Sequence, residues 1–140
     1  MATERQRLVD QIIMHEGIRY KPYLDSVGKW TIGCGRNLSD VGLSHAEVMV
    51  LLEHDLDEAI TDLSVFPWYL ELDAVRQRAV TDMRFNLGPS RFRGFKRMIR
   101  SLAEGDYPAA ASAARASIWF GQVKSRGVRI CHMLLTGEDL

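Results

Sequence analysis

Two carboxylates nine positions apart, Glu16 and Asp25, stand in different local surroundings. Glu16 ends a segment with helical period, where the negative end of the helix dipole and an apolar core would both favour a neutral carboxyl group. Asp25 begins an Asp-Ser-Val-Gly turn, where an exposed carboxylate tends to stay ionised. A proton donor paired with an ionised group that holds a water or faces a developing cation is typical of glycoside hydrolysis.

Taken alone, a glutamate and an aspartate at this spacing are more often a solvated helix end and a turn former. The residues around them favour the chemical interpretation. Glu16-Gly17 is followed by Tyr23-Leu24-Asp25, by Gly28, and by the string Thr-Ile-Gly-Cys-Gly at 31–35. In content and spacing this stretch resembles the phage-type lysozymes, the T4-like muramidases of glycoside hydrolase family 24.

The resemblance implies an α+β fold with a small antiparallel β-lobe and a larger all-helical lobe. It also implies hydrolysis of the β-1,4 bond between N-acetylmuramic acid and N-acetylglucosamine in peptidoglycan. Loss of these bonds would lyse the host cell. Glu16 would be the general acid, and Asp25 with Thr31 would position the attacking water, so that the sugar configuration is inverted. Substrate-binding roles fall on Asn37, Phe85 and Arg126, and Arg126 is also expected to fix Glu16.

Resemblance to this family continues through most of the chain, including the segments around Asp73–Gly88 and Ser117–Arg129. Two positions depart from the family pattern. Many members have a histidine where this chain has Arg36, and Ala113 stands where relatives carry a substrate-contacting amide. The cleft contacts therefore follow less directly from the resemblance than the chemistry does.

Local signals predict the elements that would position these residues. Thr3 with Gln6 starts a helix that Gly17 ends, residues 19–24 and 29–34 read as strands, and Ser44 with Glu47 starts a second helix. We expect one domain over 1–140, with 17–43 as the β-lobe, 44–63 as the connecting helix, and 1–16 with 64–140 as the helical lobe. Further helices are predicted over 73–87, 95–103, 108–116 and 124–135.

Most of the large aromatic side chains should belong to the core, because a domain of this size must bury them. This holds for Trp68, Trp119, Phe92 and Phe95. Phe85 is the exception, since by resemblance it lines the cleft.

The composition is that of an ordinary globular domain, with 140 residues, 46% hydrophobic and 26% charged. No apolar run is long enough to span a membrane, and the N-terminus lacks a signal-peptide pattern. We therefore expect a protein without stable membrane insertion, kept in the host cytoplasm until it is released to the cell wall. We also expect a monomer. The resemblance implies that a holin-type membrane pore releases it.

Cysteine and histidine usage indicates neither a disulfide framework nor a metal centre. Cys34 and Cys131 are expected to be buried free thiols, and the four histidines lack metal-ligand spacing. The sequence predicts no metal and no cofactor.

The net charge is zero, but the charges are unevenly distributed. Residues 37–75 hold nine acidic side chains and no lysine or arginine, whereas residues 76–129 hold twelve basic and three acidic ones. This asymmetry is compatible with an ordinary solvated surface or with a cleft wall that attracts anionic peptidoglycan. Nucleic acid is the competing anion, because Arg93, Lys96, Arg97 and Arg100 fall on one side of a predicted helix. The absence of an overall positive charge and of interleaved aromatic residues argues against it.

Two other functions suit the same fold. One is a catalytically silent wall-binding or virion structural domain, which need not keep Glu16, Asp25 and Thr31 together. The other is a transglycosylase, which would release an anhydro product. Analysis of the products from digested peptidoglycan distinguishes the three possibilities.

Overall fold

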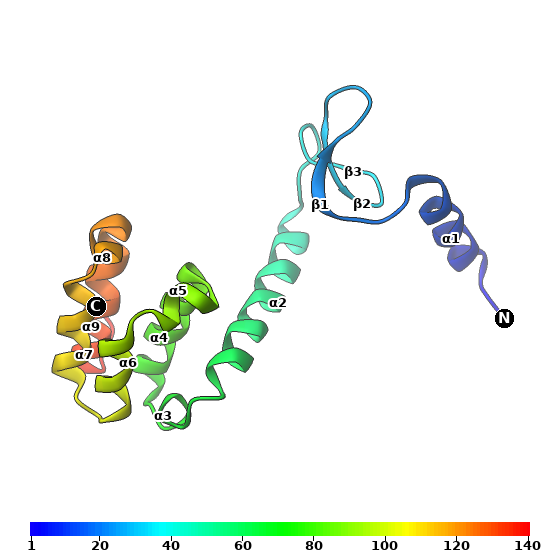
Figure 1. Ribbon diagram of the computed structural model, residues 1–140. Helices are drawn as coiled ribbons and strands as arrows, with labels where there is room; N and C mark the ends of the chain where they lie inside the picture. Colours follow the sequence, from blue (N-terminus) through cyan, green and yellow to red (C-terminus); the bar gives the residue numbers. More distant parts are fainter. The chain divides into compact units, whose positions relative to one another are not determined.

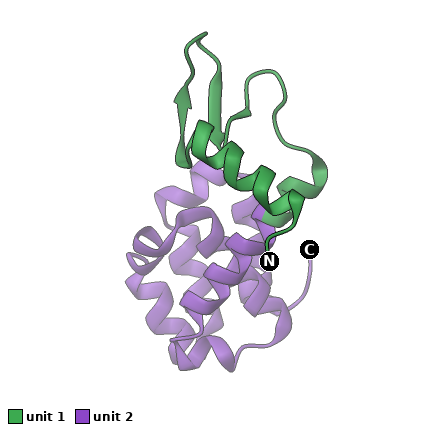
Figure 2. Ribbon diagram, turned by 90° about the vertical axis from the view of Figure 1, so that its right-hand side faces the viewer, with its two compact units in different colours: residues 1–50 green, residues 51–140 purple.

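The computed structural model describes residues 1–140 and divides them into two compact units, Met1–Val50 and Leu51–Leu140 (Figure 2). Unit 1 holds a helix and a small sheet, and unit 2 is entirely helical. This composition confirms the α+β class. The predicted grouping of residues 1–16 with 64–140 stays a prediction.

Unit 1 begins with α1, Glu4–Glu16, which is capped by Thr3 at its start and by Gly17 at its end. The Thr3 hydroxyl accepts a hydrogen bond from the Gln6 backbone N–H, whereas the Gln6 side chain donates to Asp10 instead of returning to Thr3. Gly17, at φ 73°, ends the helix and donates its N–H to the Ile13 carbonyl. The predicted helix is therefore confirmed, with half of the predicted capping box.

Three antiparallel strands follow in the order β1-β2-β3 (Figure 1). They are β1 (Arg19–Leu24), β2 (Trp30–Gly33) and β3 (Arg36–Asn37). Tyr23 lies opposite Thr31, and Thr31 lies opposite Asn37 on its other side. The first two strands match the sequence prediction, but β3 was not predicted, because two residues are too few to show an alternating pattern.

Helix α2, His45–Leu63, runs from unit 1 into unit 2. Its start has both halves of the capping box, with the Ser44 N–H donating to Glu47 Oε1 at 2.9 Å and the Glu47 N–H donating to Ser44 Oγ at 3.2 Å. The helix predicted over 44–63 is confirmed.

Unit 2 continues with seven further helices. They are α3 (Pro67–Leu70), α4 (Ala74–Leu87), α5 (Pro89–Arg93), α6 (Lys96–Ala103), α7 (Tyr107–Arg115), α8 (Ile118–Val123) and α9 (Ser125–Thr136). The four helices predicted here correspond to α4, α6, α7 and α9. The short helices α3 and α5 were missed because Pro67 and Pro89 suggested helix stops, whereas each stands in the first turn of a new helix.

The buried hydrophobic core lies in unit 2, where α7 packs against α6 and α9, and α4 packs against α9. Phe92 and Trp119 are buried in it, while Trp68 and Phe95 are partly buried against it, as predicted. The Trp119 indole N–H donates to Asn86 Oδ1 at 2.9 Å, which satisfies the one polar atom of that ring. Phe85 keeps 38% of its surface exposed, which agrees with its expected exclusion from the core.

The two cysteines are both free but differ in burial. Cys131 is buried in α9, as predicted, and burial raises the pKa of its thiol. The prediction that Cys34 is buried is wrong. Cys34 lies in the tight turn between β2 and β3, beyond the last strand residue Gly33, so its side chain has no sheet face to pack against and is exposed.

Candidate functional site

Glu16 is the last residue of α1, and its carboxyl group lies directly against the turn between β2 and β3. A Cβ atom added to Gly35 would lie 3.1 Å from Glu16 Oε2 and 3.2 Å from Glu16 Cδ. Gly35 has φ 91°, a conformation that side chains rarely adopt. The glycine therefore serves both the turn and the close approach of the carboxyl group.

Asp25 organises the turn that joins β1 to β2. One carboxylate oxygen, Oδ1, accepts hydrogen bonds from the backbone N–H groups of Val27 and Lys29, at 2.9 and 2.8 Å. The Asp25 N–H in turn donates to the Lys29 carbonyl at 2.9 Å. These bonds fix the carboxylate in a half-buried position and leave Oδ2 without a protein partner.

Thr31 is the one buried polar residue of the chain, with 4% of its surface exposed. Its hydroxyl donates to the Lys29 carbonyl at 2.9 Å, the same oxygen that accepts from the Asp25 N–H. The Thr31 hydroxyl and the Asp25 backbone are thus held through one shared acceptor. Because the Thr31 proton is used in this bond, its oxygen is left as an acceptor toward any further molecule.

Three successive elements of unit 1 therefore supply the three predicted catalytic residues. Glu16 comes from the end of α1, Asp25 from the β1–β2 turn and Thr31 from β2. The Glu16 carboxyl lies against the turn of the β2–β3 hairpin. The Thr31 hydroxyl and the Asp25 N–H both donate to the Lys29 carbonyl. Their catalytic roles stay predictions.

Asn37 lies beside Thr31 in the sheet, but its side chain is used locally. Its Oδ1 accepts from the Asp40 N–H at 3.0 Å, and its Nδ2 donates to Asp40 Oδ2 at 3.2 Å. The amide shapes the turn after β3. The substrate-binding role predicted for Asn37 stays a prediction.

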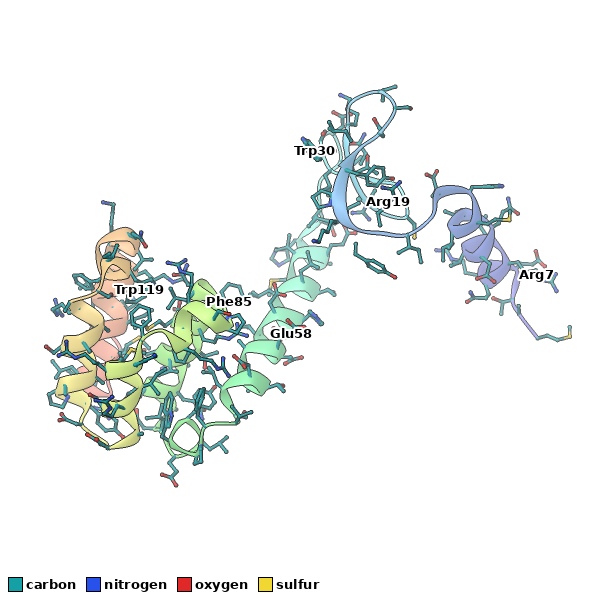
Figure 3. All side chains as sticks on the ribbon, in the orientation of Figure 1. Arg7, Arg19, Trp30, Glu58, Phe85 and Trp119 are labelled. Atoms are coloured by element: carbon teal, nitrogen blue, oxygen red, sulfur yellow. The ribbon has the colours of Figure 1, made fainter.

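Phe85 and Arg126 line the same hollow on unit 2, which has a volume of about 650 Å³. Figure 3 shows Phe85 near the end of α4. Leu52, Leu56, Ile60 and Met133 contribute apolar lining, and Arg126 with Asp82 contributes polar lining. Arg126 Nε donates to Asp82 Oδ1 at 2.7 Å. Asp82 is thus the ion-pair partner of Arg126 in this structure. The expected link between Arg126 and Glu16 stays a prediction.

Arg36 has a defined partner that sequence reasoning did not find. Its guanidinium forms an ion pair with Glu47, and Nη1 also donates to the Gly42 carbonyl at 3.3 Å. The Arg36 hydrogen bond is the largest of the effects that lower the pKa of Glu47 to about 2. The Ser44–Glu47 capping box was visible in the sequence, but only the turn geometry brings Arg36 to its acidic member.

The basic segment does not form the helix face that the sequence predicted. Arg93 belongs to α5 and pairs with Asp62 Oδ1 at 2.7 Å, and Arg84 pairs with Asp62 Oδ2 at 2.8 Å. Of the four residues predicted to share a face, only Lys96, Arg97 and Arg100 lie in α6, where they are exposed. The predicted four-residue face is therefore wrong, because α5 ends at Arg93 and the other three residues belong to the next helix.

His54, Asp55 and Glu58 form the only group of three or more side chains whose potential metal-ligand atoms lie within 4.8 Å of one another. All three are exposed on α2, and Figure 3 shows Glu58 on this helix. Exposed acidic groups of this kind are common without an ion, and the prediction of no metal or cofactor stays a prediction. No helix of the chain combines the length and the apolar character needed to cross a membrane.

Comparison with known proteins gives one family match and several relatives. The sequence pattern of the phage lysozyme family matches residues 14–129. The chain is 26% identical to the pre-baseplate central spike protein Gp5 of Enterobacteria phage T4, over 94% of this chain but only 28% of the length of that protein. It is 23% identical to the probable T4-type lysozyme 1 of Dictyostelium discoideum, over 91% of this chain and 93% of the relative. It is 28% identical to the SAR-endolysin of Enterobacteria phage P21, over 81% of this chain and 70% of the relative.

Proposed function

Since the chain belongs to the phage lysozyme family and is a glycosidase of the lysozyme type, we propose that it hydrolyses the β-1,4 bond between N-acetylmuramic acid and N-acetylglucosamine in peptidoglycan. The hydrolysis proceeds with inversion, and Glu16, Asp25 and Thr31 carry it out. Two sets of contacts support this assignment. The Glu16 carboxyl lies against the β2–β3 turn, and Asp25 and Thr31 share the Lys29 carbonyl.

Glu16 is the proton donor. Its proton passes to the glycosidic oxygen as the bond between that oxygen and the anomeric carbon breaks, so the leaving sugar departs as an alcohol. The position of Glu16 at the end of α1, with one side against a backbone turn and the other exposed, leaves the carboxyl accessible to a polymer.

Asp25 and Thr31 hold the attacking water between two acceptors. The Asp25 Oδ2 atom is free of protein hydrogen bonds, and Thr31 Oγ1 has already donated its proton to Lys29. Both oxygens therefore accept hydrogen bonds from the water, whose lone pair is left for the anomeric carbon. The new carbon–oxygen bond forms on the face opposite the leaving group, and the released proton passes to Asp25.

The single observation that carries this proposal is the hydrogen-bond set that couples Asp25 to Thr31 through Lys29. A catalytically silent wall-binding or structural domain is the alternative with specific support, because one relative is a central spike protein. Such a domain would not need Thr31 buried with its hydroxyl tied to the Asp25 turn.

Mass spectrometry of digested peptidoglycan tests the proposal against its alternatives. We expect hydrated muropeptides from the parent protein, whereas anhydro muropeptides would indicate a transglycosylase and no cleavage would indicate a silent domain. Glu16→Gln should reduce the rate by about 10² to 10⁴-fold, because the amide cannot give up a proton. Activity within about threefold of the parent, in a folded Glu16→Gln protein, would exclude Glu16 as the donor.

The remaining features of the proposed function concern access to the polymer. Asn37, Phe85 and Arg126 contact substrate, and the protein acts as a monomer that does not bind nucleic acid. The protein stays in the host cytoplasm until a separate holin-type pore releases it to the wall. Its hydrolysis of the wall then lyses the cell. Family membership and the relatives named endolysin support action on peptidoglycan.

A further inference from the structure

The turn that faces Glu16 is anchored by the residue that follows it. Residues 33–35 connect β2 to β3, and the backbone of Gly35 forms the surface against which the Glu16 carboxyl lies. Arg36 is the first residue of β3 and is bonded directly to Gly35. Any movement of Arg36 is therefore passed to the contact between Gly35 and Glu16.

Arg36 is itself held at two points outside the turn. Its guanidinium pairs with the Glu47 carboxylate in the first turn of α2 and donates to the Gly42 carbonyl in the loop before that helix. Glu47 is fixed in turn, because its other carboxylate oxygen accepts the Ser44 N–H at 2.9 Å. The planar guanidinium is thus tied to a helix start that has few ways to move.

The pair adds an anchor without adding net charge. Glu47 neutralises Arg36, and the low pKa of Glu47, caused chiefly by the Arg36 hydrogen bond, keeps the carboxylate ionised above about pH 3. About three-fifths of each side chain is covered, with 38% of Arg36 and 39% of Glu47 exposed. The anchor is therefore present throughout the pH range in which a lysozyme would act.

We propose that Arg36 is a positioning residue for the reaction, which acts through its ion pair with Glu47 to hold the Gly33–Gly35 turn, and with it the Glu16 carboxyl, in place. This proposal rests on the proposed function, because it gives Arg36 a role only if Glu16 is the proton donor. Arg36 affects the orientation of the proton donor, so its loss should lower kcat. Substrate affinity should change little, because Arg36 need not touch the sugar.

The test compares purified Arg36→Gln, Glu47→Gln and Arg36→Lys proteins with the parent on soluble peptidoglycan fragments. We expect either amide variant to lower kcat by about tenfold or more, with KM within about twofold, since small displacements of a reacting group have large effects on rate. The double variant should lose no more than either single one, because both remove the same ion pair. Arg36→Lys should restore part of kcat.

Two controls separate positioning from a general loss of stability. Ser44→Ala removes the hydroxyl half of the same helix cap and leaves the Ser44 N–H and the ion pair intact, so its kcat should match that of the parent. Arg7→Gln removes an exposed arginine–glutamate pair in α1 and should also leave kcat unchanged. The Glu16 carboxyl carbon should shift in the ¹³C NMR spectrum of Arg36→Gln and keep its parental position in Ser44→Ala.

The outcomes distinguish this proposal from the one on which it rests. If Glu16→Gln is inactive while folded Arg36→Gln and Glu47→Gln keep kcat within twofold of the parent, Arg36 has no positioning role and the proposed function stands. If Glu16→Gln is active, both proposals fail. If Arg36→Gln does not fold, Glu47→Gln decides, and an unshifted Glu16 carboxyl signal in that variant also overturns the proposal.

Discussion

At the scale of single residues, the contact between Glu16 and Gly35 is the most demanding feature of the site. It requires a backbone in the left-handed region and no side chain on it. The sequence motif places a glycine at this position, but nothing in the motif tells what the missing side chain makes room for. The close approach of Glu16 Oε2 supplies that reason.

Gly35→Ala should lower activity by about tenfold or more, because its methyl group would push the Glu16 carboxyl aside. The variant should also lose about 1–2 kcal/mol of unfolding free energy through its positive φ. Gly105→Ala is the matched control, since Gly105 has φ 73° and open space around it. It should show a similar loss of stability in urea unfolding and full activity. Equal activity in the two variants would contradict the steric role of Gly35.

Phe85 and Phe92 are two phenylalanines whose roles the structure separates. Phe92 is fully buried in the core, so Phe92→Ala should reduce the unfolding free energy by about 3–5 kcal/mol. Phe85→Ala should cost about 1 kcal/mol, because much of that ring is already exposed. The main effect of Phe85→Ala should be a raised KM, if Phe85 contacts substrate. An unchanged KM would remove Phe85 from the substrate-binding residues.

At the scale of elements, Asp62 links three helices of unit 2. It lies in α2 and accepts hydrogen bonds from Arg84 of α4 and Arg93 of α5. The hydrogen bond from Arg93 is the largest cause that lowers the pKa of Asp62 to about 2. The folded chain thus binds this proton more weakly than the unfolded chain, where an aspartate has a pKa of about 3.9.

These ion pairs should contribute about 2 kcal/mol of stability above about pH 4, and the contribution should fade as the pH falls to about 2. Asp62→Asn should therefore be less stable than the parent at pH 7, and the difference should narrow toward pH 3. Urea unfolding at both pH values measures it. Asp139→Asn, which breaks an exposed pair with Arg78, serves as the control and should change stability little. A pH-independent difference for Asp62→Asn would contradict the ion-pair account.

The elements also show where sequence reasoning succeeds and where it stops. Helix ends marked by a cap, such as Thr3 or Ser44, were predicted correctly because the capping residue acts over three or four positions. The two-residue strand β3 was missed and the exposure of Cys34 was predicted wrongly, since both depend on how tightly the chain turns after Gly33. The Arg36–Glu47 pair spans eleven positions and follows from that same turn.

At the scale of the whole molecule, the predicted catalytic residues and the hydrophobic core lie in different units. Glu16, Asp25 and Thr31 lie in unit 1, whereas the buried hydrophobic residues lie in unit 2. The resemblance predicts these three site residues together because they are close in sequence, at positions 16–31. The substrate contacts predicted at distant positions, such as Arg126, depend on side-chain partners that no local pattern encodes.

Expression in a susceptible host tests the proposed dependence on a pore. Cells that produce the chain and lack holins should keep growing, and permeabilising the inner membrane should then cause rapid lysis. The same treatment of cells that carry Glu16→Gln should not lyse them at that rate, which controls for the permeabilising agent. Lysis by the unmodified chain without the agent would show that no separate pore is needed.

The stereochemistry of the first product tests the central claim most directly, because it reports where the water attacks. Proton NMR of a defined peptidoglycan fragment, recorded within minutes of adding enzyme, should show the α-anomer of the new reducing end before mutarotation, and Glu16→Gln should produce none at that time. An initial β-anomer would mean that Asp25 attacks the sugar itself and that the water held by Asp25 and Thr31 is not the nucleophile of the first step.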